Sequence, residues 1–360
     1  MAEKQTLTAS QRAALFSQAT RQNHQMLPTQ TATSGASTLT FTFPKARLLS
    51  KVLLDIEMKT KITHASKTDL PTDLTVFNPY SLIRRISLDM NNGFHPYVIG
   101  GAECAMLNMI SRNNPAYIYD VINKADESGY GYWKNKGASS TGKENTIGFT
   151  LELPITLNDR DPVSLIMLQN EQTVVNLTVD IANGAELLNH AEGYSVEITE
   201  VKVTPMAETF SIPASTDAFP DISVLKLTAS RNDNFVGAGQ HIVKLSTGTI
   251  YRRLLFRILN KDGKPMETSD ITSNIELVFN QADTNYSISP RALRRLNTTQ
   301  YGYSLPKGMY VFDFAFQGTV NLSGTRDYVD TERLTEMWLR FSTNDSGTIQ
   351  IVSETIARLA

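Results

Sequence analysis

Apolar and polar residues alternate with a period of two in many short segments of the chain. In residues 37–44, Leu39, Phe41 and Phe43 alternate with threonines, and residues 146–157 follow the same pattern. Successive side chains of a β-strand point to opposite faces, so each such segment is typical of a half-buried strand. Turn residues separate these segments. The pattern predicts an all-β fold of antiparallel strands.

Two segments about 170 residues apart share one pattern. Residues 78–93 read NPYSLIRRISLDMNNG, and residues 247–263 read TGTIYRRLLFRILNKDG. Each holds an arginine pair in an alternating apolar run that ends at an Asn/Asp/Gly turn. A short helix and further strands are expected after each. This repeated order predicts two similar domains, and runs of strands with few helices favour two tandem eight-stranded jelly rolls over a parallel sheet.

The length of 360 residues fits two domains of ordinary size. We expect a helical arm and a polar linker at residues 1–37, the first jelly roll at residues 38–205 and the second at residues 206–360. In the arm, Ser10 is a suitable N-cap, and no Gly or Pro follows it up to Met26.

A long excursion separates the strands near residues 90 and 147. Short helices are expected there from Ala102 and from Pro115, and another later in the chain from Pro290. A Gly-rich loop in the excursion carries three aromatic residues, Tyr130, Tyr132 and Trp133. Aromatic side chains are enriched at interface cores, so we predict that this loop contacts a neighbouring subunit. The alternative is a loop that folds over the end of its own barrel.

The two arginine pairs place one arginine each on the packed face of a strand, because neighbouring residues point to opposite faces. Arg84 has the parity of Leu82 and Ile86, and Arg252 has the parity of Leu254. A buried arginine needs a carboxylate or backbone carbonyls as partners. We therefore predict that Arg84 and Arg252 are structural braces inside the protein, with anion binding as the alternative.

The composition supplies no catalytic or metal-binding pattern. The five histidines are scattered, no His-x-His occurs, and the single cysteine, Cys104, excludes both an internal disulfide and zinc-ligand spacing. No nucleophile elbow, P-loop or dinucleotide-binding glycine pattern is present. The net charge of -2 gives no electrostatic reason to bind nucleic acid. We expect no enzyme activity, no cofactor, no metal and no direct specific nucleic-acid binding.

The tandem jelly rolls, the helical arm and the phrase NPYSLIRRISLDMNNG together resemble the major capsid proteins of the tectivirus family, which are tailless phages with an internal membrane. The resemblance is best to those that infect Gram-positive hosts, and it is strongest over residues 41–101. It implies homotrimers with a pseudo-hexagonal outline that tile an icosahedral shell over a lipid membrane. It also implies synthesis in the host cytoplasm, location in the virion capsid, and contacts with neighbouring trimers and with minor capsid and vertex proteins.

The same resemblance implies that the N-terminal helix lies at the base of the trimer and faces the membrane. The arm is mildly basic, and it carries a thin apolar stripe; the residues concerned are Lys4, Arg12, Leu15, Phe16 and Arg21. Anionic lipid headgroups attract such charges, whereas the narrow stripe is too small for deep insertion. We expect contact with the membrane and no penetration.

Two other functions remain open at this point. A glycan-binding or glycan-processing protein can be built on paired jelly rolls, but such proteins are usually exported and no secretory signal is recognisable here. A receptor-binding spike is a different virion component, but it would more often carry a fibrous repeat, and none is present.

Overall fold

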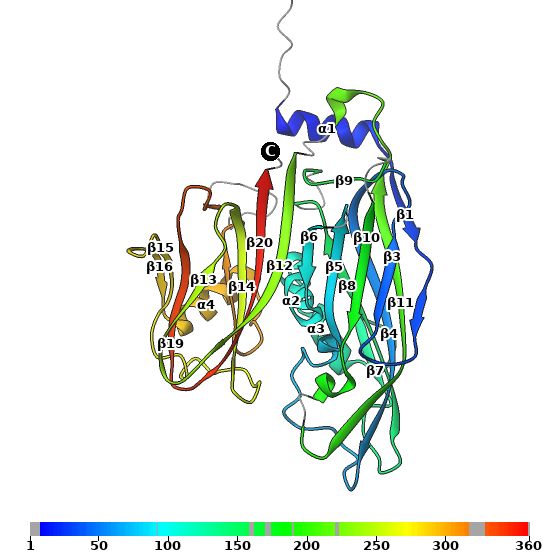
Figure 1. The fold of residues 1–360 in the computed structure, drawn as a ribbon, viewed down its shortest axis with the longest axis vertical. Helices are drawn as coiled ribbons and strands as arrows, with labels where there is room; N and C mark the ends of the chain where they lie inside the picture. The colour runs from blue at the N-terminus through cyan, green and yellow to red at the C-terminus, as the bar shows by residue number, and fades with distance from the viewer. Residues whose placement is uncertain are drawn as a thin grey trace, which may run out of the picture.

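The computed structural model describes residues 8–91, 93–157, 162–169, 174–188, 191–219, 223–316 and 328–358. Strands dominate this part of the chain, and helices lie in the connections or across one end of the molecule (Figure 1). The helices are α1 (Ala9–Ala19), α2 (Gly101–Arg112), α3 (Ala116–Asn123) and α4 (Pro290–Tyr301), with the 3-10 helices η1 (Pro79–Leu82), η2 (Gly184–Leu188) and η3 (Thr216–Ala218).

Within the described residues the strands form three sheets. The first has the order β1 (Gln22–Met26), β11 (Tyr194–Phe210), β4 (Leu48–His64), β8 (Lys143–Pro154) and β7 (Gly131–Lys134), with β2 (Gln30–Ala32) on β11 and β9 (Ile166–Met167) on β4. The second has the order β17 (Met309–Asp313), β14 (Ile250–Asn260), β20 (Gly347–Arg358), β12 (Val224–Phe235), β6 (Phe94–Ile99), β5 (Ile83–Met90), β10 (Val175–Ile181) and β3 (Thr38–Thr42), with β18 (Val329–Asp330) on β14. The third has the order β13 (Gly239–Leu245), β19 (Met337–Thr343), β15 (Ile275–Phe279) and β16 (Asp283–Ile288).

These sheets build two β-sandwiches, which we call the first and the second barrel. In the first, the first sheet packs on strands β6, β5, β10 and β3, and residues such as Leu54 and Ile86 share one core. In the second, strands β17, β14, β20 and β12 pack on the third sheet, where Phe256 and Leu339 share a separate core. The period-two pattern of the sequence therefore corresponds to burial on one face of each strand.

The second sheet runs through both barrels without a break. Strands β12 and β6 pair in parallel, with Thr228 opposite Tyr97 and Ala229 opposite Val98. Figure 1 shows the two barrels side by side, joined at these strands. Backbone hydrogen bonds thus tie the two barrels together along their shared sheet.

Helix α2 lies at the contact between the barrels. Its residues from Gly101 to Ile110 are all buried, so it is covered on every side, as expected for a helix without a polar face. Gly101 is required by close packing, because a Cβ at this position would collide with the carbonyl oxygen of Tyr80. Second-barrel residues Leu255 and Val352 belong to the core of the first barrel. The outer face of β14 and β20 is therefore buried as well, which explains the nearly continuous apolar run of β14.

The N-terminal helix α1 lies across one end of the first barrel, the same end at which the C-terminus is found (Figure 1). Phe16 is buried there against Leu48 and Leu165, and its ring lies 5.3 Å from that of Phe210. Thr8 caps the helix, because its side chain accepts a hydrogen bond from the Gln11 amide.

The domain limits differ from the predicted ones at two points. Residues 22–26 and 30–32 were expected in the arm and linker, but they form β1 and β2 on β11. The side chains of β1 are mostly exposed on both faces, so this edge strand has no alternating hydrophobic pattern. The boundary predicted at residues 205 and 206 falls inside β11, which pairs with β4 as far as Phe210.

Candidate functional site: the contact between the barrels and the exposed ends

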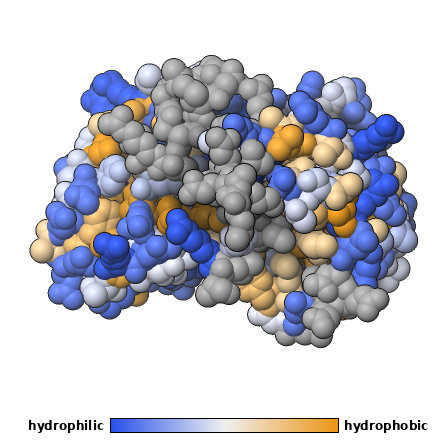
Figure 2. All heavy atoms as spheres, turned by 90° about the horizontal axis from the view of Figure 1, so that it is seen from above, coloured by the Kyte–Doolittle hydropathy of each residue, from blue (hydrophilic) through white to orange (hydrophobic). Residues whose placement is uncertain are grey.

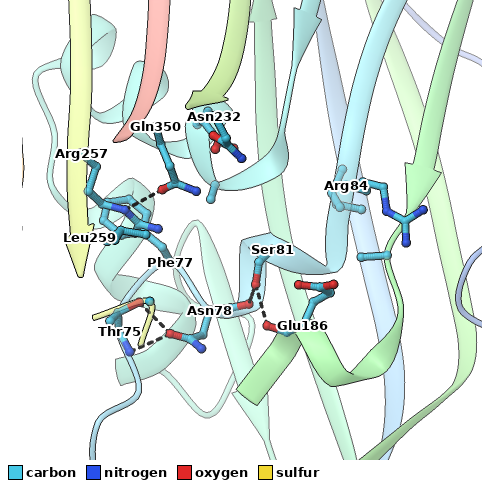
Figure 3. A pocket seen from close by; sticks show the side chains of 15 residues that line it. Thr75, Phe77, Asn78, Ser81, Arg84, Glu186, Asn232, Arg257, Leu259 and Gln350 are labelled. Carbon is cyan, nitrogen blue, oxygen red and sulfur yellow. Dashed lines mark hydrogen bonds between the residues drawn. The ribbon is translucent and has the colours of Figure 1, made fainter. Parts of the chain in front are cut away.

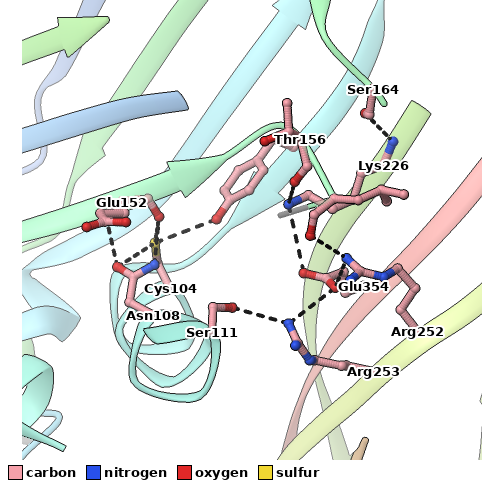
Figure 4. Close-up of polar contacts among 12 residues, drawn as sticks. Cys104, Asn108, Ser111, Glu152, Thr156, Ser164, Lys226, Arg252, Arg253 and Glu354 are labelled. Atoms are coloured by element: carbon pink, nitrogen blue, oxygen red, sulfur yellow. Dashed lines mark hydrogen bonds and ion pairs between the residues drawn. The ribbon is translucent and has the colours of Figure 1, made fainter. Parts of the chain in front are cut away.

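A group of charged side chains fills the contact between the barrels; Figure 4 labels Lys226, Arg252, Arg253 and Glu354 of this group. We call it the charged junction, and it consists of Lys226, Arg252, Arg253, Asp313 and Glu354. All five come from the second barrel, on β12, β14, β17 and β20. Their hydrogen bonds reach backbone and side-chain oxygens of the first barrel.

Arg252 is the centre of the charged junction. Its Nη1 atom donates to Glu354 Oε1 at 2.7 Å and to the Leu157 carbonyl oxygen, in the first barrel, at 3.0 Å. Its Nε donates to the Tyr328 hydroxyl at 2.9 Å. Only 3% of Arg252 is exposed. A guanidinium with this many partners can be buried without leaving charge or donors uncompensated.

Two further cations surround Glu354. Arg253 donates to Asp313 Oδ2 at 3.1 Å and lies 3.5 Å from Glu354 Oε1. The Nζ of Lys226 lies 4.0 Å from Glu354 Oε2 and donates to the Thr156 carbonyl oxygen of the first barrel at 2.6 Å. Burial by itself raises the pKa of Glu354, but the three cations together outweigh burial and lower the pKa to about 2. The carboxylate is therefore charged throughout the neutral range.

Both arginine pairs lie at a β-bulge. In β5, Arg85 is opposite Asp180 and Ile83 is opposite Ile181, so Arg84 is an extra residue without an opposite partner. In β14, Tyr251 is opposite Thr355 and Arg253 is opposite Glu354, so Arg252 is the extra residue. A bulge interrupts the alternation of faces. The two halves thus share this local irregularity as well as the order of elements.

The bulge explains why the prediction for Arg84 is wrong. The prediction rests on the parity that Arg84 shares with Leu82 and Ile86, but Leu82 belongs to η1 and the bulge at Arg84 breaks the alternation that leads to Ile86. Arg84 and Arg85 are both exposed, and Arg85 forms an ion pair of 3.8 Å with Asp180. Arg252, in contrast, is buried within the charged junction.

The aromatic loop folds onto its own barrel. Trp133 is 2% exposed, and its Nε1 donates to Asn145 Oδ1 at 2.9 Å. The Tyr132 hydroxyl donates to Glu57 at 2.8 Å. Trp133 is therefore unavailable to a neighbouring subunit, and that part of the prediction is wrong. Tyr130 stacks on Tyr117 with ring centres 4.0 Å apart and remains 37% exposed.

The predicted membrane-facing residues of the arm are separated by the structure. Lys4 lies outside the described residues. Arg12, Leu15 and Arg21 are exposed. Phe16 is buried against the first barrel, so the prediction that it faces a membrane is wrong; its role is to attach α1. Figure 2, which views the molecule from this end, shows hydrophilic residues around much of the rim with scattered hydrophobic patches.

Sequence reasoning missed a cavity that lies beside α2, between the barrels. Arg257 lies on the same face of β14 as Arg253, and only 7% of this residue is exposed, because the first barrel covers that face. No signal along the chain brings the lining residues together, since they come from segments far apart in the sequence.

The described part of the chain holds neither a metal-binding cluster nor a membrane-spanning helix. No group of three or more His, Cys, Asp or Glu side chains there is arranged to hold a metal ion. None of the helices there is both long and apolar enough to cross a bilayer.

Comparison with protein-family models finds no match, and comparison with curated proteins finds none either. Solved structures do match. The STIV MCP superposes with a TM-score of 0.67 and 14% identity, over 94% of this chain and 97% of that chain. PBCV-1 VP54, in a structure fitted into a reconstruction of the virophage Sputnik, has a TM-score of 0.63 and 11% identity, over 95% of each chain. The major capsid protein P2 from bacteriophage PM2 has a TM-score of 0.56 and 9% identity, over 94% and 98%.

At these identities the likeness establishes the fold. The two barrels are jelly rolls in tandem, and the likeness extends over nearly the whole chain. The predicted all-β, double jelly-roll fold is confirmed.

Proposed function

We propose that the chain is a structural major capsid protein that assembles as homotrimers and tiles an icosahedral virion shell. The observation that carries this proposal is coverage in both directions: the chain matches capsid proteins such as that of bacteriophage PM2 from end to end, at 94% of its own length and 98% of theirs. Function here rests on the whole surface of the molecule and not on one cleft.

The contact between the barrels supports this proposal physically. A tile of a closed shell has to keep its two barrels in one orientation, because a hinge would spoil the fit to neighbouring tiles. The shared sheet across β12 and β6 and the buried charged junction both oppose such a hinge. Buried ion pairs are weak evidence for stability, but they do specify one arrangement when every partner is satisfied.

The finer part of the proposal concerns the membrane. Arg12, Leu15 and Arg21 are exposed at the end of the molecule where α1 lies. We infer that this end faces an internal lipid membrane, as the resemblance of residues 41–101 to tectivirus capsid proteins implies. Minor capsid and vertex proteins are then further partners of the shell.

The test of the assembly is the oligomeric state of the purified full chain. Light scattering after size exclusion is expected to give three times the chain mass, and negative-stain electron microscopy is expected to show particles with a pseudo-hexagonal outline. Well-folded monomers at micromolar concentration would contradict an obligate trimer. Glycan arrays and a hydrolase screen test the alternative of a glycan-binding or glycan-processing protein. No feature of the described residues favours that alternative.

The arm needs a variant of its own. A truncation to residue 25 would remove most of β1, which is part of the first sheet. Deletion of residues 1–20 removes α1 and leaves β1 in place. We expect this variant to form trimers but to assemble poorly with membrane, whereas assembly equal to that of the full chain would exclude a role for α1.

A further inference from the structure

The cavity between the two barrels has a volume of about 260 Å³ and is lined by residues of both (Figure 3). We call it the inter-barrel cavity. At about 30 Å³ for each water, it has room for roughly nine waters. The first barrel contributes the segment before β5, the start of α2 and η2, and the second barrel contributes β12, β14 and β20. Arg84 and Asn232 line it and are exposed, so the cavity is accessible to solvent.

Arg257 is the unusual residue of this cavity. Its Nε donates to Gln350 Oε1 at 2.8 Å, and its guanidinium lies 4.3 Å from the ring centre of Phe77. Its Nη1 is buried and has no hydrogen-bond partner among the described residues. Buried donors are nearly always paired, and an unpaired charged donor is especially costly. Burial also lowers the pKa of Arg257 to about 10, which the nearby Glu103 offsets only in part.

The nearest carboxylate does not neutralise Arg257 directly. Glu103 lines the same cavity, but its carboxylate folds back over the start of α2, where a Cβ on Gly100 would collide with it. No ion pair joins Glu103 to Arg257 in the described part of the chain. Burial raises the pKa of Glu103 and so favours its uncharged form. The guanidinium thus keeps one donor for a group that the chain itself does not supply.

We propose that the inter-barrel cavity binds a small carboxylate with a single negative charge, which accepts a hydrogen bond from Arg257 Nη1. The Gln350 side chain supplies a second donor, because its Oε1 is already engaged by Arg257 and its amide nitrogen remains for the ligand. Both groups line the cavity from neighbouring strands of one sheet.

The charges that line the cavity favour one negative charge over two. Arg84 and Arg257 line it together with Glu103 and Glu186, so a phosphate dianion would meet at least one acidic side chain as well as the arginines. A carboxylate matches the flat guanidinium and carries half that charge at neutral pH. Phosphate is therefore expected to bind more weakly.

The test is titration of the full chain with formate, acetate and propionate by calorimetry at neutral pH, with chloride replacing each anion to keep ionic strength constant. Saturable binding of at least one of these carboxylates is expected. Arg257→Gln should weaken binding about tenfold or more, the effect of losing a hydrogen bond to a charged group. Arg295→Gln removes an exposed arginine outside the cavity and should bind like the wild type.

A second variant keeps the test decisive if Arg257→Gln does not fold. Gln350→Glu keeps the size of the side chain and an acceptor for Arg257 Nε, but it removes the amide donor and adds a negative charge to the cavity, so carboxylate binding should be lost. Absence of saturable binding in the wild type would mean that the cavity holds only water, and would overturn the proposal. Equal affinities of the wild type and Gln350→Glu, or of the wild type and a folded Arg257→Gln, would also overturn it.

Discussion

Arg252 and Glu354 form an ion pair of 2.7 Å whose side chains are 3% and 1% exposed. The pair does not stand alone, since Arg253 and Lys226 approach the same carboxylate and hydrogen bonds extend to Thr156 and to Leu157 of the first barrel. One acidic side chain therefore holds three cations at the contact between the barrels. Its removal would leave all three cations with fewer partners, and two of them, Lys226 and Arg252, are buried.

The first prediction concerns Glu354→Gln. Breaking a buried ion pair by removing one partner leaves an uncompensated charge and typically costs about 3–5 kcal/mol. We expect the free energy of unfolding to fall by that amount in urea denaturation. Glu332→Gln, at an exposed acidic residue, should change it by less than about 0.5 kcal/mol. Equal stabilities of the two variants would show that the charged junction contributes little.

The second prediction is the pH dependence that the same residue produces. The pKa of Glu354 is about 2 in the folded protein against 4.5 for the free group. A lowered pKa stabilises the fold above the unfolded value, and that stabilisation is lost as the pH falls toward the folded value. The loss between about pH 5 and pH 2 should be about 3 kcal/mol. It should be absent from Glu354→Gln when unfolding is followed by urea denaturation across this range.

Glu103 should act in the opposite direction, and it provides the internal control. Its pKa is raised, chiefly by burial, so the folded state binds a proton more tightly than the unfolded chain. Protonated Glu103 therefore stabilises the fold at low pH, and this stabilisation is lost as the pH rises through its folded pKa. The Glu103→Gln variant should therefore lose less stability than the wild type between acidic and neutral pH. A steeper loss in the variant would contradict the direction of this shift.

The third prediction compares the two bulged arginines. Arg84→Gln changes an exposed side chain and should alter the free energy of unfolding by less than about 0.5 kcal/mol. Arg252→Gln removes a buried charge from Glu354 and hydrogen bonds from Tyr328 and Leu157, and should cost about 2–3 kcal/mol. A similar loss of unfolding free energy in both variants would mean that the two bulged arginines contribute equally to stability, and would contradict this prediction. Chemical denaturation of both variants in parallel decides the matter.

The contrast between Arg84 and Arg252 shows how far alternation along the chain predicts structure. Alternation located the strands because burial on one face is a local property with a period of two. A bulge inserts one extra residue into a strand and so shifts the alternation of faces. Nothing in the local sequences RRIS and RRLL reveals that a bulge occurs there. Only the partner strand determines where that residue goes. The side chain of Arg84 is exposed to solvent. The side chain of Arg252 forms an ion pair with the carboxylate of Glu354, which lies 102 residues away in sequence.

The same reasoning explains the other differences. Residues 22–26 form an edge strand whose side chains are mostly exposed, so its hydrophobic pattern gave no indication of a strand. Each of its residues nevertheless pairs with a residue of β11. Trp133 was read as an interface residue from its place in a Gly-rich loop. In the structure Trp133 is buried and donates to Asn145 in the same barrel. The composition of the loop does not distinguish contact with a neighbouring subunit from packing on its own barrel. The burial of Arg257 has no signal in the local sequence of β14, because the layer that covers this strand comes from the other barrel.

The fourth prediction is that Cys104 does not react in the folded protein. Burial raises the pKa of its thiol to about 12, with the nearby Tyr97 offsetting this in part. At pH 8 the thiolate population is then on the order of 10³-fold smaller than that of a free cysteine. Labelling with a disulfide reagent should be slower by at least that factor than in urea. Ser17→Cys, on the exposed side of α1, should label rapidly and serves as the control.

The fifth prediction tests the membrane-facing end. Arg12 and Arg21 are exposed at the end where α1 lies, and each basic residue near an anionic bilayer contributes about 1 kcal/mol, or roughly fivefold in affinity. The double variant Arg12→Gln, Arg21→Gln should therefore bind phosphatidylserine vesicles about 25-fold more weakly in co-sedimentation. Arg295→Gln, on α4 away from that end, is the matched control and should bind like the wild type. Binding should also weaken with salt, because exposed charges are screened. If the double variant and the control bind anionic vesicles equally, the membrane lies against some other surface of the protein.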